Sequence, residues 1–186
     1  MNFDARRTEA LKKWENLRKR KGTVIYVGAA SCGRAAGIDR IIDAINHYLE
    51  ESGLKADIVE VGCIGVCCFE PLIYIQKDGN IPVCYANLTP KLTSELLEDV
   101  LQNGMMREDL ALGTVGKEGY GSIPSIFEHP MLKPQVRIVL RNCGIIDPNS
   151  IDHYIARDGY LGINKALKMK PEEVIDAVKT ADYEID

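Results

Sequence analysis

No apolar run in the chain approaches the roughly 18 residues that a membrane-spanning helix needs. The N-terminus, MNFDARRTEA, lacks the apolar core and the small-residue cleavage site of a secretory signal. An excess of basic charge is also missing, because 27 acidic side chains outnumber 23 basic ones and the net charge is -4. Binding to nucleic-acid phosphates requires a basic face. We therefore expect a cytoplasmic protein with no direct membrane insertion and no nucleic-acid partner.

The motifs of several enzyme classes are incomplete. A thioredoxin-type thiol oxidoreductase needs CxxC, and Cys32-Gly33-Arg34-Ala35 has only the first cysteine. The stretch 28–35 imitates a phosphate loop, yet Arg34 and Ala35 stand where lysine and Ser or Thr would reach phosphate and magnesium. The three histidines have no acid or nucleophile at a useful spacing. A redox role for a single cysteine is the one thiol chemistry that these motifs leave open.

Hydrophobic periodicity predicts an α/β domain of the thioredoxin-like type in residues 23–104. The expected elements are a strand at 23–30, a helix at 38–51, strands at 56–61, 72–76 and 81–86, and a helix at 89–102. The loop between the first strand and helix is glycine-rich, and an Asp-Gly turn signal separates the last two strands. Thr89 is the expected N-cap of the last helix. The order βαβ followed by ββα predicts the fold, and Glu70-Pro71 stands where such folds often carry a cis-proline.

The segments outside this domain have simpler patterns. An amphipathic helix is expected within residues 1–22. Residues 105–134 are rich in glycine and proline and are expected to form a linker. A helical extension with three short helices is expected in residues 135–186, after an extended segment or strand at 136–140.

Six cysteines are many for a reducing compartment, where thiols are usually buried hydrophobes, ligands or redox groups. Cys63 and Cys67 form CxxxC in the loop after the second strand, and Cys32 follows the first strand. Loops after neighbouring parallel strands leave the same edge of a sheet, so the three thiols are expected to converge. Converging thiolates suit zinc or iron–sulfur chemistry. Cys84 and Cys143 lie beside aliphatic residues and are expected to be buried hydrophobes.

Six segments together resemble a known family. They are SCGRAAG, GCIGVCCFEPLIYIQKDG, YANLTP, QVRIVLRNCGIIDP, DHYIARDGY and MKPEEVIDAVK. In this order they resemble the N-terminal part of the flavoprotein subunit of NADH dehydrogenase (complex I) and of related NAD-linked hydrogenases and formate dehydrogenases. The resemblance covers nearly the whole chain and implies a thioredoxin-like ferredoxin domain that binds a [2Fe-2S] cluster through four cysteines, two on each loop. Cys63 and Cys67 match the second pair, and Cys32 matches the second member of the first pair.

Two departures from the family matter. Val27 stands where relatives with a full set carry the remaining cysteine, so the matched thiols are one ligand short of a [2Fe-2S] site. Either Cys68, Cys84 or a non-cysteine group completes the set, or no cluster binds. Relatives also continue into a glycine-rich loop that cradles FMN and then into the NADH site, whereas this chain stops at Asp186. We therefore expect neither FMN nor NAD to bind here by the family's means.

Two hypotheses follow from the resemblance. The first is an electron-transfer module that relays single electrons through a [2Fe-2S] cluster held by Cys32, Cys63 and Cys67. Its partners would be flavin- and iron–sulfur-containing subunits of an NADH-linked oxidoreductase complex, and catalysis would lie elsewhere in that complex. The alternative, supported by Val27, is a clusterless thioredoxin-like module used for docking or dimerisation in the same complex. A homodimer is compatible with either hypothesis.

Overall fold

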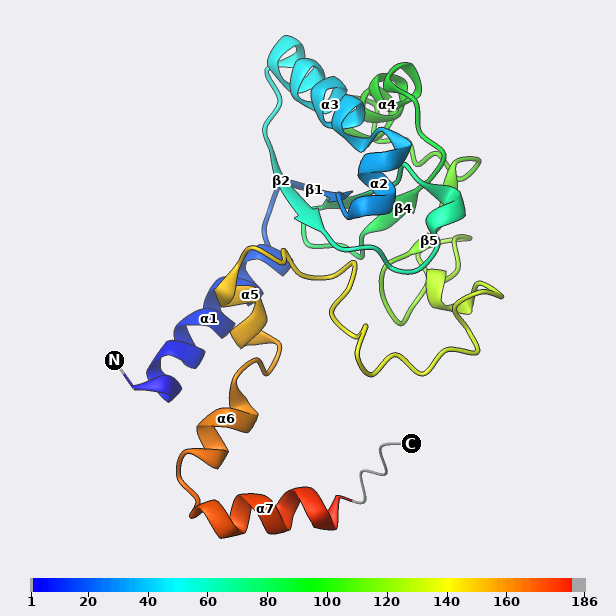
Figure 1. The fold of residues 1–186 in the computed structure, drawn as a ribbon. Helices are drawn as coiled ribbons and strands as arrows, with labels where there is room; N and C mark the ends of the chain where they lie inside the picture. The colour runs from blue at the N-terminus through cyan, green and yellow to red at the C-terminus, as the bar shows by residue number, and fades with distance from the viewer. Residues whose placement is uncertain (1, 182–186) are drawn as a thin grey trace. The chain divides into compact units, whose positions relative to one another are not determined.

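The structure is a computed structural model that describes residues 2–181 (Figure 1). These residues form two compact units. One unit combines residues 2–14 with residues 151–181, and the other consists of residues 15–150. The second unit contains the sheet and all six cysteines.

A five-stranded sheet organises the larger unit. Its strands are β1 (Thr23–Gly28), β2 (Ala56–Val61), β3 (Ile73–Lys77), β4 (Val83–Tyr85) and β5 (Ala111–Thr114), in the order β2-β1-β3-β4-β5. β1 runs parallel to β2, and the pairs β1–β3, β3–β4 and β4–β5 are antiparallel. A helix, α3 (Ile38–Ser52), connects the parallel strands, and α4 (Pro90–Leu97) follows the β3–β4 hairpin. This βαβ and ββα topology confirms the predicted thioredoxin-like α/β fold.

The alternation of side chains along the strands produces two apolar cores, one on each face of the sheet. Ile25 and Val27 of β1 face α3 and α4, which lie together on one side of the sheet (Figure 1). Val24 and Tyr26 belong to the opposite core. That second core is covered by the loops that follow β2 and β5. The apolar side chains that these loops contribute include Ile64, Val66, Ile126 and Leu132.

The remaining helices of the ββα part follow the sequence signals closely. Thr89 caps α4, because its Oγ1 accepts a hydrogen bond from the Leu92 N–H at 3.2 Å. Pro90 occupies the first turn, and a π-helical turn (Glu98–Gln102) completes the predicted helix. The Glu70–Pro71 peptide bond is cis.

The structure differs from the sequence patterns in three places. The expected glycine-rich loop contains a short helix, α2 (Ser31–Ala36). The stretch 105–134, for which composition favours a linker, contains β5, which hydrogen-bonds to β4 and extends the sheet. Residues 136–140 form a bend and turns and no strand. β5 is an edge strand whose pairing depends on β4, and this long-range contact leaves little trace in local composition.

The smaller unit is helical. It contains the first residues of α1 (Phe3–Arg18), together with α5 (Ile151–Ala156), α6 (Leu161–Ala166) and α7 (Pro171–Thr180). Trp14 packs edge-to-face on His153 with ring centroids 4.9 Å apart, and Lys13 Nζ pairs with Asp152 Oδ2 at 2.9 Å. The last residues of the chain, from 182 onward, lie outside the described residues. Among residues 2–181, no helix is long and apolar enough to cross a membrane.

Candidate functional site

Cys32 is positioned by the tight junction between β1 and α2. It is the second residue of α2, and the next residue, Gly33, is buried against the end of β1. A Cβ on Gly33 would lie 1.8 Å from the carbonyl oxygen of Gly28. Only glycine permits this close approach. The approach places Cys32 at the edge of the sheet where β1 ends.

Cys63 and Cys67 are positioned by the loop that follows β2. Ile64 and Val66 alternate with the cysteines and are buried in the core, so they anchor the loop to the sheet. Gly65 lies between them at a φ of 97°, a left-handed conformation that favours glycine. Its N–H donates a hydrogen bond to Cys63 Sγ at 3.2 Å. Cys67 then begins a short 3-10 helix (Cys67–Phe69).

The three cysteines that the sequence predicts to converge lie together in the structure. The Sγ atoms of Cys32, Cys63 and Cys67 all lie within 4.8 Å of one another. The Cys63 and Cys67 sulfurs are 3.4 Å apart. Cys32 and Cys63 are half-buried, whereas Cys67 is exposed. The group therefore has one face against the protein and one face toward solvent.

Burial disfavours the thiolate forms of Cys32 and Cys63. Burial raises the pKa of Cys63 to about 12. The hydrogen bond from the Gly65 N–H opposes this rise, and the neighbouring Cys32 and Cys67 thiols add to it. Burial also raises the pKa of Cys32. Thiolate ligands form when a metal displaces these protons, so the site suits a cation that bonds sulfur strongly.

A carboxylate that the sequence analysis did not single out lies beside the thiols. Glu70 Oε1 accepts a hydrogen bond from Cys32 Sγ at 3.7 Å, and Glu70 Oε2 accepts one from the Leu72 N–H at 3.1 Å. Burial raises the pKa of Glu70, although the hydrogen bonds from Leu72 and Cys32 oppose this effect. Its neighbourhood contains Gly28 and Gly33, where a Cβ would come within 3.2 and 3.3 Å of Oε2.

The other candidate ligands lie apart from the group. Cys68 Sγ is directed to Met131 Sδ, 3.9 Å away. Cys84 lies on β4 and is fully buried in the core, where burial raises its pKa well above the ordinary thiol value. Val27 is also fully buried, within the core on the α3–α4 side of the sheet. Cys143 is half-buried next to Gly62.

A further residue that the sequence analysis missed holds the cysteine loop in place. The Arg137 guanidinium donates hydrogen bonds to the carbonyl oxygens of Ile64 at 2.5 Å and Leu140 at 3.1 Å. Gly144, in the same segment, packs on Ile64 so closely that a Cβ would lie 1.7 Å from Ile64 Cγ2 and 3.3 Å from the Tyr74 hydroxyl. That hydroxyl is buried and has no hydrogen-bond partner among the described residues. The segment 137–144 therefore forms an outer wall for the loop of Cys63.

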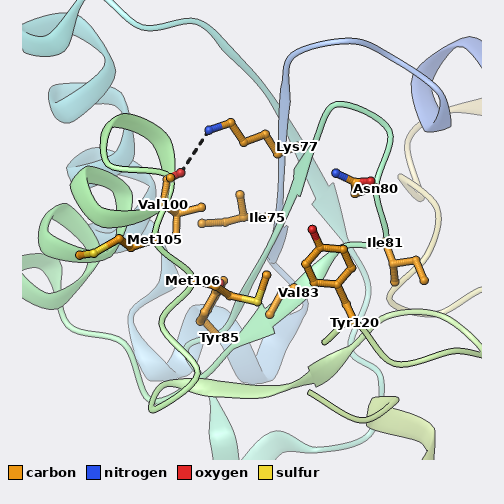
Figure 2. Close-up of a pocket in the computed structure, with 11 residues that line it drawn as sticks. Ile75, Lys77, Asn80, Ile81, Val83, Tyr85, Val100, Met105, Met106 and Tyr120 are labelled. Atoms are coloured by element: carbon orange, nitrogen blue, oxygen red, sulfur yellow. Dashed lines mark hydrogen bonds between the residues drawn. The ribbon is translucent and has the colours of Figure 1, made fainter. Parts of the chain in front are cut away.

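A separate pocket of about 120 Å³ opens on the sheet face that carries β3 and β4 (Figure 2). Apolar side chains such as Ile75, Val83 and Met106 line it together with polar ones such as Asn80, and it shares no residue with the cysteine group. Lys77 Nζ lies at its rim and donates hydrogen bonds to the carbonyl oxygens of Val100 at 3.4 Å and Leu101 at 3.5 Å. The one cation in the lining is therefore occupied within the protein. The cysteine group is the stronger candidate for chemistry.

Comparison with known proteins finds sequence similarity to a curated protein and several similar structures. No family model matches the chain. Over 47 residues, the chain is 62% identical to the NADP-reducing hydrogenase subunit HndC of Solidesulfovibrio fructosivorans. This match covers 25% of the chain and 10% of that subunit, so the chain spans only a small part of its relative's length.

The similar solved structures include a thioredoxin-like [2Fe-2S] ferredoxin from Aquifex aeolicus. One structure of it is 16% identical with a TM-score of 0.44, and the similarity covers 50% of this chain and 93% of the ferredoxin. A structure of the wild-type ferredoxin gives a TM-score of 0.43 at 17% identity, over 50% and 98% of the two chains. The strand order and the connections described above are the basis on which we assign the thioredoxin-like fold.

Proposed function

We propose that this chain is an electron-transfer module that holds a [2Fe-2S] cluster at Cys32, Cys63 and Cys67. The observation that supports it is the convergence of the three sulfurs, within 4.8 Å of one another, at one edge of a thioredoxin-like sheet. Thiolates are the usual ligands of iron–sulfur clusters. The donor set therefore has the right chemistry for the cluster, and three of its four positions are present.

The residues around the thiols have separate tasks in this proposal. When bound, a [2Fe-2S] cluster accepts and returns single electrons. The Gly65 N–H directs a hydrogen bond at Cys63 Sγ, and hydrogen bonds of this kind tune the potential of a cluster. Ile64 and Val66 close the protein side of the site with buried hydrocarbon. Cys67 lies on the exposed side, where a partner protein can approach.

The match to a hydrogenase subunit supports a place in an NAD(P)-linked complex. HndC is by its name a subunit of an NADP-reducing hydrogenase, and 47 residues of this chain are 62% identical to it. We place the chain between a flavin and an iron–sulfur centre of such a complex. A reduced flavin would lose one electron to the module, and an oxidised iron–sulfur centre would take that electron on. The relay itself needs no bond change.

Anaerobic purification and reconstitution test this proposal. We expect about two irons and two acid-labile sulfides per chain, a visible charge-transfer spectrum, and an electron paramagnetic resonance (EPR) signal after reduction by dithionite. Cys63→Ala, which removes the donor atom, should abolish or strongly reduce all three. The matched control is Cys68→Ala, because Cys68 is adjacent to Cys67 and its sulfur is directed to Met131.

Two results would contradict the cluster. Protein that stays colourless and free of iron after reconstitution would favour the clusterless docking module, for which the hydrocarbon side chain of Val27 is the supporting observation. One zinc per chain without sulfide would instead indicate a mononuclear thiolate site. Size-exclusion chromatography of the same samples would show whether two copies associate in either state.

A further inference from the structure

A [2Fe-2S] cluster at this site has one ligand position that the three converging thiols do not fill. Four protein ligands are usual for this cluster. The two cysteines that the sequence analysis offered for the position are both directed elsewhere. Cys68 Sγ contacts Met131 Sδ, and Cys84 is fully buried in the core on β4. Neither of these cysteines is directed at the site, so we turn to the other donor side chains at the same edge of the sheet.

Glu70 lies at that edge and is held there on two sides. It directly follows the 3-10 helix that begins with Cys67. One carboxylate oxygen is 3.7 Å from Cys32 Sγ, and the other accepts the Leu72 N–H at 3.1 Å. Gly28 and Gly33 leave room for the carboxylate, since a Cβ at either position would lie close to Oε2. The side chain is thus held beside Cys32, the one thiol of the group that follows β1.

We propose that Glu70 is the fourth ligand of the site, because its carboxylate lies beside the Cys32 thiol as the Cys63 and Cys67 thiols lie beside each other. This inference rests on the proposed cluster. Two donors on one tetrahedral metal, at bond lengths of about 2.0 to 2.3 Å, lie roughly 3.5 Å apart. The Cys63–Cys67 pair, at 3.4 Å, and the Cys32–Glu70 pair, at 3.7 Å, both fit one edge of such a tetrahedron.

The chemistry of the carboxylate is consistent with this role. Iron accepts oxygen as well as sulfur donors. Oε1 is the oxygen that faces the Cys32 thiol, and Oε2 is engaged by the Leu72 N–H, which orients the carboxylate. Hydrogen bonds that orient a ligating carboxylate are a regular feature of metal sites. No other cysteine is then needed to replace the ligand that is missing at Val27. The Glu70 carboxylate oxygen, which comes from the loop after β2, takes its place.

Glu70→Gln is the first test. Glutamine keeps an oxygen that can accept the Leu72 N–H and removes the anionic donor. In the reconstituted full chain, we expect the variant to lose iron to a chelator about tenfold faster or more, and to show altered EPR g-values. Glu60→Gln is the matched control, because Glu60 lies on β2 and pairs with Arg34 at 2.8 Å. That control should keep the wild-type spectrum and the wild-type rate of iron loss.

Two further measurements make the ligand assignment direct. Pulsed EPR on reduced protein carrying 13C-labelled glutamate should detect a carboxylate carbon coupled to the cluster, and Glu70→Gln should abolish that coupling. Glu70→Cys should retain the cluster and shift its spectrum to that of an all-thiolate site, which also shows that the fold tolerates change at this position.

The outcomes separate this inference from the proposed function. If Glu70→Gln keeps the wild-type spectrum and rate of iron loss while Cys63→Ala loses the cluster, Glu70 is not a ligand and the proposed function stands. A wild-type chain that takes up no iron and sulfide would overturn both.

Discussion

Arg137 is the residue whose contacts most directly control the cysteine loop. Its guanidinium donates to the carbonyl oxygens of Ile64 and Leu140 and lies 3.5 Å from that of Cys143. Ile64 stands between the two cysteines of CxxxC, so these hydrogen bonds connect the segment 137–143 to the loop that carries two of the three thiols. Arg137 thus acts on the thiols through the backbone and not by touching them.

Replacing Arg137 by alanine should loosen that loop. Hydrogen bonds to a charged group are worth about 1.5 to 3 kcal/mol, and we expect Arg137→Ala to lower the free energy of unfolding by that order. Amide hydrogen exchange, followed by mass spectrometry, should be faster across residues 62–67. Arg40→Ala, at an exposed position on α3, is the control and should leave exchange in the loop unchanged. Equal exchange rates in the two variants would show that the hydrogen bonds of Arg137 do not hold the cysteine loop.

Tyr26 makes the stability of the protein sensitive to alkaline pH. Burial raises the pKa of Tyr26 to about 12, and its hydroxyl bonds Gln76 Oε1 at 3.0 Å. An unfolded tyrosine ionises near pH 10, so the unfolded state loses this proton first. The contribution of Tyr26 to the free energy of unfolding is therefore fully present below about pH 10 and is lost as the pH rises toward about 12. Tyr26→Phe removes this contribution.

Urea unfolding at about pH 8 and about pH 11 measures the effect. Tyr26→Phe should be less stable than the wild type at the lower pH by about 1 kcal/mol, because a hydrogen bond is lost. Its further decline at the higher pH should be smaller than that of the wild type. Tyr120→Phe, at a residue that is 40% exposed, should decline in parallel with the wild type. A parallel decline of Tyr26→Phe would show that Tyr26 is not the group concerned.

The sequence predicted that the three thiols converge, but it did not predict the side chains around them. Cys32, Cys63 and Cys67 follow parallel strands, and the edge at which such strands end is a local consequence of the βαβ pattern. Arg137 could not be found in this way, because it is 73 residues from the carbonyl that it binds. Glu70 was overlooked for a related reason. The position of its carboxylate depends on the space left by Gly28, at the end of β1, and Gly33, in α2.

At the scale of elements, the segment 137–144 and the cysteine loop pack with no free space. Gly144 has a φ of 76°, and a Cβ there would lie 1.7 Å from Ile64 Cγ2. Gly144→Ala therefore combines left-handed backbone strain of about 1 to 2 kcal/mol with overpacking of about 1 to 3 kcal/mol. We expect a total loss of about 2 to 5 kcal/mol in the free energy of unfolding, measured with urea.

Gly53→Ala is the matched control for this packing. Gly53 has a φ of 68° at the end of α3, and a Cβ there would meet no heavy atom within 4 Å. It should lose only the backbone strain. Equal losses in the two variants would mean that the segment moves away from the loop without cost, and that Gly144 does not set their distance.

The elements that sequence patterns predicted well are those with local signals. β2 was expected at the residues where it forms, and the N-cap of α4 was expected at Thr89, because alternation and capping are properties of neighbouring residues. β5 was missed because its pairing with β4 is a long-range contact in a stretch rich in glycine and proline. α2 was missed because Gly33 weakens its helical propensity, while contact with Gly28 fixes its position.

At the scale of the whole molecule, the two units differ in the size of their apolar cores. The larger unit has buried side chains on both faces of its sheet. In the smaller unit, α6 and α7 contribute no buried residue, and the buried side chains are few: Ala10, Trp14, Ile155 and Ala156. Ion pairs of Asp152 with Arg6 and Lys13 add support that salt screens. The smaller unit should therefore be the less stable one.

Trp14 allows this difference to be measured, because it is the chain's single tryptophan and belongs to the smaller unit. We expect its fluorescence to change at a lower urea concentration than the far-UV circular dichroism, since a smaller apolar area resists unfolding less. Asp152→Asn, which weakens the pairs with Arg6 and Lys13, should lower the fluorescence midpoint and leave the dichroism midpoint nearly unchanged. Coincident transitions in both proteins would show instead that the two units unfold as one cooperative body.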